Sequence, residues 1–310
     1  MKSWIYIVFS IVCLFILMSC SEEDDPIERE PIEQNTQRIT YAYVSDGSYS
    51  IGSKNSLRII NVTDQEKPQE MGFVNLPSTM SGANGIYLVG KYAYVADNHN
   101  NPDIWVIDVS EPTNPKVVGS CDTPSFAQNI YVDGGYAYVA DGEAGLQVID
   151  ISDPTNPKVT GFCDTPGNAV GVGQKYNYCY IADYFEGLRI IDISDPTKPK
   201  EVGFYKDFIS TCSMGIYLTD SFCYLAHIKG LDVIDIFNPR MPERVAFCNT
   251  LLGGMPRRIY VYDDCAYLTG GEIGIIMVDI SFPRKPREIG SFDTPGYARG
   301  IYVTDNVFSN

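Results

Sequence analysis

One repeated motif spans most of this chain and limits the folds that it can adopt. An acidic or amide residue ends a short apolar run at the same place in each copy: Asn61, Asp108, Asp150, Asp192, Asp235 and Asp279. The intervals after Asp108 are 42, 42, 43 and 44 residues. A tyrosine of the preceding apolar run recurs with the same period: Tyr43, Tyr94, Tyr138, Tyr180, Tyr224 and Tyr267. The sequence therefore contains six copies of one supersecondary unit.

Each copy contains four short segments rich in Val, Ile and Tyr, and none has the periodicity of a helix. In the third copy these segments are residues 130–132, 137–140, 146–151 and 158–162. Turn residues such as Asp-Gly, Gly-Gly and Asp-Pro separate them. The third segment is almost continuously apolar, which is typical of a strand buried on both faces. Four strands in a period of about 40–45 residues indicate the blade of a β-propeller.

The two ends of the repeated region complete each other. The first copy begins at residues 39–44, which match the second strand of a copy and have no first strand before them. Residues 294–303, after the last complete copy, match the first strand of the other copies. We therefore expect an all-β, six-bladed propeller of four-stranded blades, in which the C-terminal inner strand pairs with the N-terminal three strands. This pairing leaves no open sheet edge between the first and last blades.

Residues 1–19 have the features of an export signal. Lys2 precedes an apolar run over residues 4–18, which is shorter than the about 20 residues that a membrane-spanning helix needs. The run ends in Leu17-Met18-Ser19-Cys20, which resembles a bacterial lipobox. In a lipobox the cysteine is lipidated and becomes the mature N-terminus.

The residues after Cys20 are strongly acidic and resemble the stretch that carries many Bacteroidota lipoproteins to the outer face of the outer membrane. We therefore expect a lipoprotein signal peptide (1–19), a lipidated acidic tether (20–38) and a propeller (39–310). The expected location is the outer membrane, with a lipid anchor and the propeller facing the cell exterior.

The charge balance excludes some partners. The chain has 23 Lys and Arg against 39 Asp and Glu, a formal net charge of −16. Nucleic acid is not an expected partner, because binding to phosphates requires many cationic contacts. Contact with a membrane is expected through the N-terminal lipid. The sequence contains two histidines, so neither His-based catalysis nor a His-rich metal site is expected.

Seven cysteines remain beside Cys13 and Cys20, and no two of them form a Cys-x-x-Cys motif. Five occupy strand positions at which other copies have Ala, Ser or Phe: Cys121, Cys163, Cys179, Cys223 and Cys248. We interpret the cysteines as small buried hydrophobic residues. A disulfide is the alternative, and its connectivity does not follow from the sequence.

The runs Gly-Leu-Gln-Val-Ile-Asp-Ile-Ser-Asp-Pro at 145–154 and Gly-Leu-Arg-Ile-Ile-Asp-Ile-Ser-Asp-Pro at 187–196 resemble the LVIVD repeat of bacterial and archaeal surface proteins. The resemblance covers residues 39–304. The fifth and sixth copies depart from it, with Phe237-Asn238-Pro239 and Phe282-Pro283 in place of Ser-Asp-Pro. It implies a cell-surface propeller without an agreed activity, so no catalytic residue is carried over.

Candidate ligand-binding residues lie where the innermost strands enter the central channel. The first aligned column is Asn84, Gln128, Val170, Met214, Arg257 and Arg299, and the next is Gly85, Asn129, Gly171, Gly215, Arg258 and Gly300. Three arginines thus converge on one sector of the channel mouth. Like charges repel unless an anion lies between them, so the arginines predict a site for an acidic sugar or a peptide terminus. Asn84 and Gln128 would complete its hydrogen bonding. The alternative is internal neutralisation by Asp or Glu.

The loop from Asp97 to Asp103 is rich in oxygen ligands and contains one imidazole, so Asp97, His99 and Asp103 are a candidate Ca²⁺ site. A hydrophilic surface turn explains the same residues, and no other cofactor is expected. Two columns of aspartates recur in the copies, one from Asp46 through Asp97, Asp141 and Asp183, the other from Asp108 onward. A ring that binds a cation or a polar ligand is the alternative for the first column, but we expect both columns to cap their own turns.

Two classes of function follow. The first is a non-enzymatic surface binding or scaffold protein, whose partner is an acidic glycan, a peptide or a surface protein. The second is a propeller hydrolase or lyase acting on extracellular glycans or peptides. An enzyme needs positioned acid and base groups or a metal in a cleft, and the sequence contains no recognisable catalytic motif.

Overall fold

Every element that the structure describes is a β-strand, as the β-branched and aromatic repeats predict. The structure is a computed structural model that describes residues 41–46, 56–63, 67–76, 83–97, 102–207, 212–250, 258–269 and 274–292. These residues belong to one unit, residues 39–310. Within the described ranges, no helix has the length and hydropathy that a membrane span requires.

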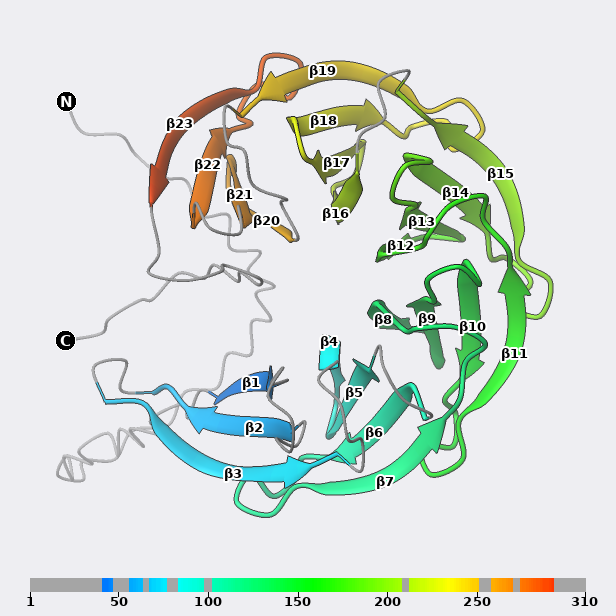
Figure 1. The fold of residues 1–310 in the computed structure, drawn as a ribbon, viewed down its shortest axis with the longest axis vertical. Helices are drawn as coiled ribbons and strands as arrows, with labels where there is room; N and C mark the ends of the chain where they lie inside the picture. Colours follow the sequence, from blue (N-terminus) through cyan, green and yellow to red (C-terminus); the bar gives the residue numbers. More distant parts are fainter. Residues whose placement is uncertain are drawn as a thin grey trace, which may run out of the picture. The chain divides into compact units, whose positions relative to one another are not determined.

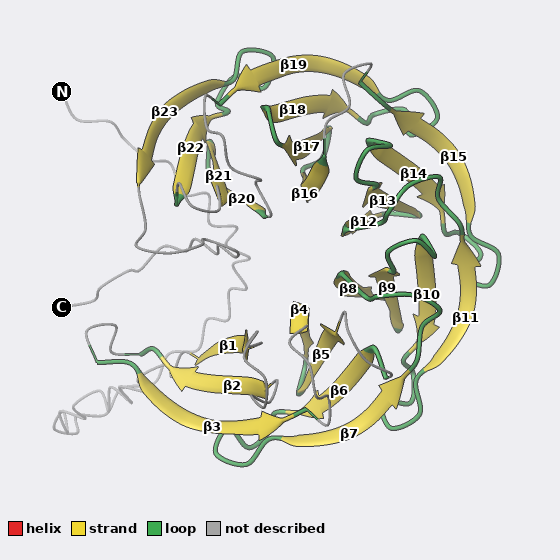
Figure 2. Ribbon diagram, in the orientation of Figure 1, coloured by secondary structure: helices red, strands yellow, loops and turns green. Residues whose placement is uncertain are grey.

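The strands form six antiparallel sheets that follow one another in sequence order, and we call them blades 1 to 6 (Figures 1 and 2). Within the described residues, blade 1 has three strands and each of the other blades has four. Blade 1 consists of β1 (Tyr41–Asp46), β2 (Ser56–Asn61) and β3 (Gln69–Asn75). Blade 2 consists of β4 (Ala83–Val89), β5 (Tyr92–Asp97), β6 (Ile104–Asp108) and β7 (Lys116–Cys121). Blade 3 consists of β8 (Asn129–Asp133), β9 (Tyr136–Ala140), β10 (Leu146–Asp150) and β11 (Lys158–Cys163).

Blades 4 to 6 have the same strand order. Blade 4 consists of β12 (Gly171–Lys175), β13 (Tyr178–Ala182), β14 (Leu188–Asp192) and β15 (Lys200–Tyr205). Blade 5 consists of β16 (Ser213–Leu218), β17 (Phe222–His227), β18 (Gly230–Asp235) and β19 (Glu243–Asn249). Blade 6 consists of β20 (Ile259–Tyr262), β21 (Cys265–Thr269), β22 (Ile275–Asp279) and β23 (Arg287–Phe292).

The blades surround a central axis, with the first strand of each four-stranded blade innermost and the fourth outermost (Figure 1). Contacts link consecutive inner strands, from β4 to β8, β12, β16 and β20. We call the face that carries the loops between second and third strands, together with the connections between blades, the loop face. The face with the turns between third and fourth strands is the turn face. This arrangement is that of a β-propeller.

The core lies between blades. Five clusters of buried side chains each join two consecutive blades, from blades 1 and 2 to blades 5 and 6. The third strands contribute to both sides, which confirms the prediction for residues 146–151: Leu146, Val148 and Ile149 are completely buried. A bulge interrupts the pairing of third and fourth strands at the same point in every blade, as at Val148/Ile149. The bulge increases the local twist of each blade.

The predicted closure pairs a described strand, β1, with residues that lie outside the described ranges. In blade 1 the order is β1-β2-β3, so β1 is the inner strand among the described residues of that blade. Blade 1 and blade 6 stand at the two ends of the series (Figure 1). The segment predicted to pair with β1, residues 301–303, lies outside the described residues. The pairing therefore stays a prediction.

The seven cysteines of the propeller are free thiols, and four of them are buried. Burial raises the pKa of six thiols, which keeps them protonated and unreactive: Cys121, Cys163, Cys179, Cys223, Cys248 and Cys265. The interpretation as small buried residues is confirmed for Cys179, Cys212, Cys223 and Cys248. Cys121, Cys163 and Cys265 are only partly buried, and all seven are free thiols in the structure.

Candidate functional site

Three of the residues predicted at the channel mouth meet in the structure. Nδ2 of Asn84 in β4 donates a hydrogen bond of 3.2 Å to Oε1 of Gln128, just before β8. From blade 6, Nη2 of Arg258 donates to the backbone oxygen of Asn84 at 2.8 Å. Side chains of blades 2, 3 and 6 thus join at the channel mouth. Arg257 and Arg299 lie outside the described residues, so the cluster of three arginines stays a prediction.

The second column at the channel mouth has a packing role. A Cβ atom on Gly171 would lie 2.8 Å from the carbonyl oxygen of Met214 in the next blade, closer than real Cβ atoms come to any neighbour. A Cβ on Gly215 would lie 3.2 Å from the carbonyl carbon of Arg258. Glycine in this column therefore lets neighbouring inner strands approach each other.

Two of the candidate Ca²⁺ residues, Asp97 and Asp103, form hydrogen bonds within the protein. The Asp103 carboxylate accepts a hydrogen bond from the Thr123 N–H at 3.1 Å, and the Thr123 hydroxyl oxygen lies 3.3 Å from the same carboxylate. The Asp97 N–H donates to the Asp103 backbone oxygen at 2.7 Å. His99 lies outside the described residues. Among the residues that are described, no group of three His, Cys, Asp or Glu side chains could hold a metal ion.

The aspartates after the second strands of blades 3 and 4 fasten the connections between blades; the expectation that they cap their own turns was wrong. In blade 3, Asp141 accepts hydrogen bonds from the Thr123 hydroxyl at 2.6 Å and the Ser125 N–H at 3.1 Å. The turn is already closed by its backbone, since the Ala144 N–H donates to the Asp141 carbonyl at 2.9 Å. The side chain is therefore available to the loop that crosses above it.

Blade 4 has the same arrangement. We call the hydrogen bonding of the aspartate after the second strand to the connection between blades a latch. Asp183 accepts hydrogen bonds from the Thr165 hydroxyl at 2.7 Å and the Gly167 N–H at 3.0 Å. Burial raises the pKa of Asp141 to about 6, and it also raises the pKa of Asp183 and of Asp103. The latches thus contain carboxyl groups that take up protons closer to neutral pH than an exposed aspartate does.

The second column of aspartates, on the turn face, does cap its own turns. Each carboxylate accepts a hydrogen bond of 2.9–3.0 Å from the backbone N–H two residues later, in the pairs Asp108–Ser110, Asp150–Ser152, Asp192–Ser194, Asp235–Phe237 and Asp279–Ser281. The prediction for this column is confirmed, and these residues have a structural role.

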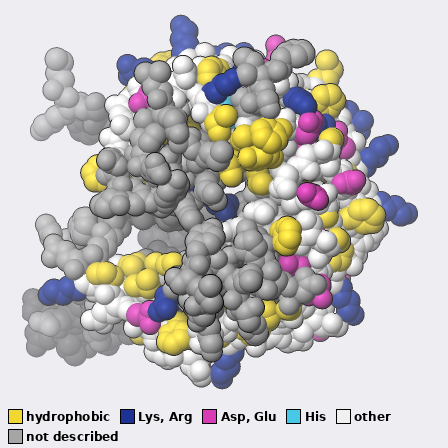
Figure 3. Space-filling model, in the orientation of Figure 1, with side chains coloured by type: hydrophobic (Ala, Val, Ile, Leu, Met, Phe, Trp, Pro, Cys, Tyr) yellow, Lys and Arg dark blue, Asp and Glu magenta, His cyan; other side chains and the backbone are white. Residues whose placement is uncertain are grey.

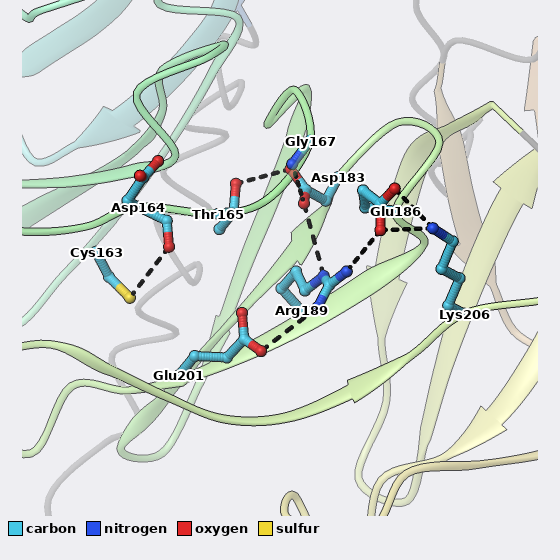
Figure 4. A network of polar contacts seen from close by, with 9 residues as sticks. All are labelled: Cys163, Asp164, Thr165, Gly167, Asp183, Glu186, Arg189, Glu201 and Lys206. Carbon is cyan, nitrogen blue, oxygen red and sulfur yellow. Dashed lines mark hydrogen bonds and ion pairs between the residues drawn. The ribbon is translucent and has the colours of Figure 1, made fainter.

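A charged network lies beside the latch of blade 4 (Figure 4). Arg189 in β14 is almost fully buried, and its guanidinium lies 3.6 Å from Asp183, 3.0 Å from Glu186 and 3.5 Å from Glu201. Lys206 forms a second ion pair of 2.6 Å with Glu186. Burial of a cation is costly unless acidic groups compensate it, and here three carboxylates do so. Arg189 is therefore an internal structural cation.

Blade 5 has different chemistry at the corresponding positions. Asp232 takes the place of Arg189 and pairs with Arg244 at 3.2 Å, and Arg244 also pairs with Asp207 at 3.0 Å. His227 takes the place of Asp183, and its ring stacks on Phe247 with centroids 5.7 Å apart. The cation therefore lies on the third strand in blade 4 and on the fourth strand in blade 5. In blade 5 the linked ion pairs of Arg244 with Asp232 and Asp207 replace the hydrogen bonds of the latch.

Ser213, His227 and Asp232 of blade 5 are all buried, and Ser213 stands opposite His227 in the register of β16 and β17. The Lys229 N–H donates to Nδ1 of His227 at 3.2 Å, so Nε2 carries the proton of the neutral ring. Nε2 lies 3.5 Å from Asp232. A hydrolytic relay needs a ring nitrogen free to take the serine proton. Because neither nitrogen has this role here, the three residues do not form such a relay.

An aromatic loop stands on the loop face of blade 4, between β13 and β14. Tyr184 and Phe185 contact each other edge to face with ring centroids 4.2 Å apart, and Phe185 is 48% exposed. Tyr184 has a φ of 47°, in the left-handed region, where blade 3 has Gly142 with a φ of 56°. Apolar side chains gather between blades 4 and 5 on the face shown in Figure 3, with acidic side chains beside them.

Sequence reasoning missed the residues that distinguish blades 4 and 5, although a signal was present. The second position of the third strand differs in almost every copy, while its neighbours are nearly constant: Arg58, Trp105, Gln147, Arg189, Asp232 and Ile276. A polar residue that varies inside a buried strand marks a place where each blade satisfies a different partner.

Comparison with known proteins agrees with this architecture. A family model described as LVIVD repeat matches five consecutive segments, residues 82–123, 126–165, 166–207, 212–250 and 253–294, each of which coincides with one of blades 2 to 6. No curated protein matches the sequence. The crystal structure of the computationally designed Ika8 protein is similar, with a TM-score of 0.62 and 9% identity over 86% of this chain and 77% of that one. At this identity the likeness concerns the fold alone.

Proposed function

The chain belongs to the LVIVD repeat family, and we propose that it is a non-enzymatic lipoprotein of the cell surface that presents a β-propeller for binding a ligand or a protein. Lipid anchoring is supported by Cys20 at the end of the apolar run and by the acidic residues behind it. Both features lie outside the described residues. The proposed ligand is an acidic glycan, a peptide or a surface protein.

The observation that carries the binding role is the aromatic loop of blade 4. A bulky residue in the left-handed region costs about 1–2 kcal/mol, and Gly142 of blade 3 holds the same backbone position without that cost. Tyr184 keeps the unfavourable conformation and places an aromatic pair on the loop face. Rigid aromatic side chains on loops of a stable scaffold are typical of recognition surfaces.

A binding screen tests this proposal. Arrays of acidic glycans and of peptides with free carboxyl termini are probed with the wild type and with the Tyr184→Gly, Phe185→Ala and Phe162→Ala variants. Tyr184→Gly adopts the blade 3 residue and relieves the backbone, so its melting temperature stays equal or rises while binding falls about tenfold. Phe185→Ala loses binding similarly.

Phe162 is the matched control, because its ring is 67% exposed on the outer strand of blade 3. Its replacement leaves binding unchanged. Equal binding by all four proteins would remove the aromatic loop from the recognition surface, and the absence of any array signal for the wild type would contradict the proposed ligand classes.

Protease treatment of intact cells tests the location separately. We expect the wild type to be digested from outside, whereas a Cys20→Ala variant is no longer held at the surface. A wild type that resists digestion until the outer membrane is broken would show that the protein faces the periplasm.

A further inference from the structure

The turns between the third and fourth strands of blades 5 and 6 carry exposed apolar side chains. Phe237 is 86% exposed, Met241 is 74% exposed and Phe282 is 73% exposed. The same positions in blades 3 and 4 are polar: Ser152, Asn156 and Asp153, and Ser194, Lys198 and Asp195. These three side chains add nothing to the core, so their exposure indicates contact with something outside the propeller.

The two turns are neighbours and also carry cations. Nη2 of Arg284 in the blade 6 turn donates to Oδ2 of Asp235 in blade 5 at 3.4 Å. Arg240 and Lys285 are exposed in the same turns. We call this surface the tip patch, and it consists of Phe237, Arg240, Met241, Phe282, Arg284 and Lys285.

The chain enters the propeller on the face that carries the tip patch. Tyr41, the first described residue, pairs with Asn61, the last residue of β2. Asn61 is the counterpart of Asp235 and Asp279, which precede the two turns of the tip patch. Tyr41 therefore begins β1 on the turn face. Twenty residues separate it from Cys20, and these reach about 70 Å at most when fully extended.

We propose that the tip patch rests on the phospholipid surface of the membrane that anchors the chain. The aromatic and methionine tips enter the boundary between headgroups and acyl chains, while Arg240, Arg284 and Lys285 contact lipid phosphates. The net charge of −16 opposes a general attraction to anionic lipid, so insertion of the apolar tips supplies the binding.

The proposal rests on the lipid anchoring in the proposed function, because the tether holds the patch at high local concentration and makes a weak contact sufficient. It also gives the propeller an orientation. With the turn face on the membrane, the loop face and its Tyr184–Phe185 pair point away from the membrane.

The test uses the mature chain from Ser21 without its lipid, so that the patch is measured apart from the anchor. Sedimentation with phosphatidylcholine–phosphatidylglycerol vesicles compares the wild type with Phe237→Ser/Phe282→Ser, which removes both rings without adding a charge. We expect the wild type to partition onto the vesicles and the double variant to partition at least about tenfold less, because partial burial of two phenylalanine rings contributes at least this factor.

The control is Phe162→Ser/Phe292→Ser, which removes two rings that are 67% and 65% exposed on outer strands. It partitions like the wild type, and thermal melts verify that both variants are folded. Equal partitioning of all three proteins, or no partitioning of the wild type at high lipid, would overturn the proposal. Neither result affects the protease test of anchoring, so the two proposals fail separately.

Discussion

Gly161 in β11 faces the carbonyl oxygen of Pro196 so closely that a Cβ atom on residue 161 would lie within 3.0 Å of that oxygen. The same relation joins Gly119 to Pro154 and Gly203 to Pro239. Each Asp-Pro or Asn-Pro turn therefore sits on the outer strand of the preceding blade. The fit depends on a missing side chain, and it places the turns of consecutive blades in a fixed register.

Replacement of Gly161 by alanine is expected to destabilise the propeller by about 1–3 kcal/mol, because the turn of blade 4 must move away from β11. Urea denaturation measures this as a lower midpoint. Gly290→Ala is the control, since its Cβ would meet only the flexible end of Met277 at 3.2 Å. A Gly161→Ala midpoint equal to that of Gly290→Ala would show that the blade contact can relax at no cost.

The stability of the propeller is expected to increase as the pH falls from 7.5 to 5. The pKa of Asp141 is raised by burial to about 6 in the folded state, against 3.8 ordinarily, so the folded state binds a proton in this range and the unfolded state does not. Folding is therefore favoured below pH 6, and this contribution is lost as the pH rises through the folded pKa. Asp141→Asn should reduce the difference by about 1.4 kcal/mol, because about one pH unit of this window lies below the folded pKa; thermal melts at both pH values measure it.

Asp150→Asn is the matched control for the pH experiment. The pKa of Asp150 is lowered by its hydrogen bonds from Ser152, so this carboxylate stays ionised between pH 5 and 7.5. Its replacement should leave the pH dependence in that window unchanged. A wild-type melting temperature that rises from pH 5 to 7.5 would contradict the sign of the predicted effect.

Deletion of residues 299–310 is expected to expose the inner edge of β1. The truncated chain should aggregate or lose its cooperative melt, because an unpaired strand edge templates association with other chains. Size-exclusion chromatography and calorimetry measure both effects. If the truncated protein stays monomeric and melts like the full-length chain, the pairing of residues 301–303 with β1 is wrong.

The double variant Arg257→Ala/Arg299→Ala is expected to lose binding of acidic glycans or peptides by at least about tenfold, because each arginine can form a bidentate pair with a carboxylate. Arg258 is left in place, since it donates to the Asn84 carbonyl and holds blades 2 and 6 together. The same arrays used for the aromatic loop provide the measurement. Equal binding by the wild type and the double variant would show that Arg257 and Arg299 do not bind the ligand and have a structural role.

The sequence alone determined the blade and its repetition. The period from Asp108 to Asp279 and the apolar run of residues 146–151 are local patterns, and a strand needs little beyond alternating or continuous apolar residues and a turn to be recognised. The caps at Asp150 and Asp192 were predictable for the same reason, because their partners lie two residues away.

Only the tertiary structure decided the partners of residues that look alike in the repeat. Asp141 and Asp150 both end strands, yet Asp141 bonds Thr123 in the loop that enters its blade, 18 residues earlier in the chain. Arg189 and Asp232 hold equivalent positions with opposite charges, and each is compensated by side chains from other strands. Long-range hydrogen bonds and ion pairs depend on which loops pass over a strand end. That geometry arises only when the blades have packed together around the axis.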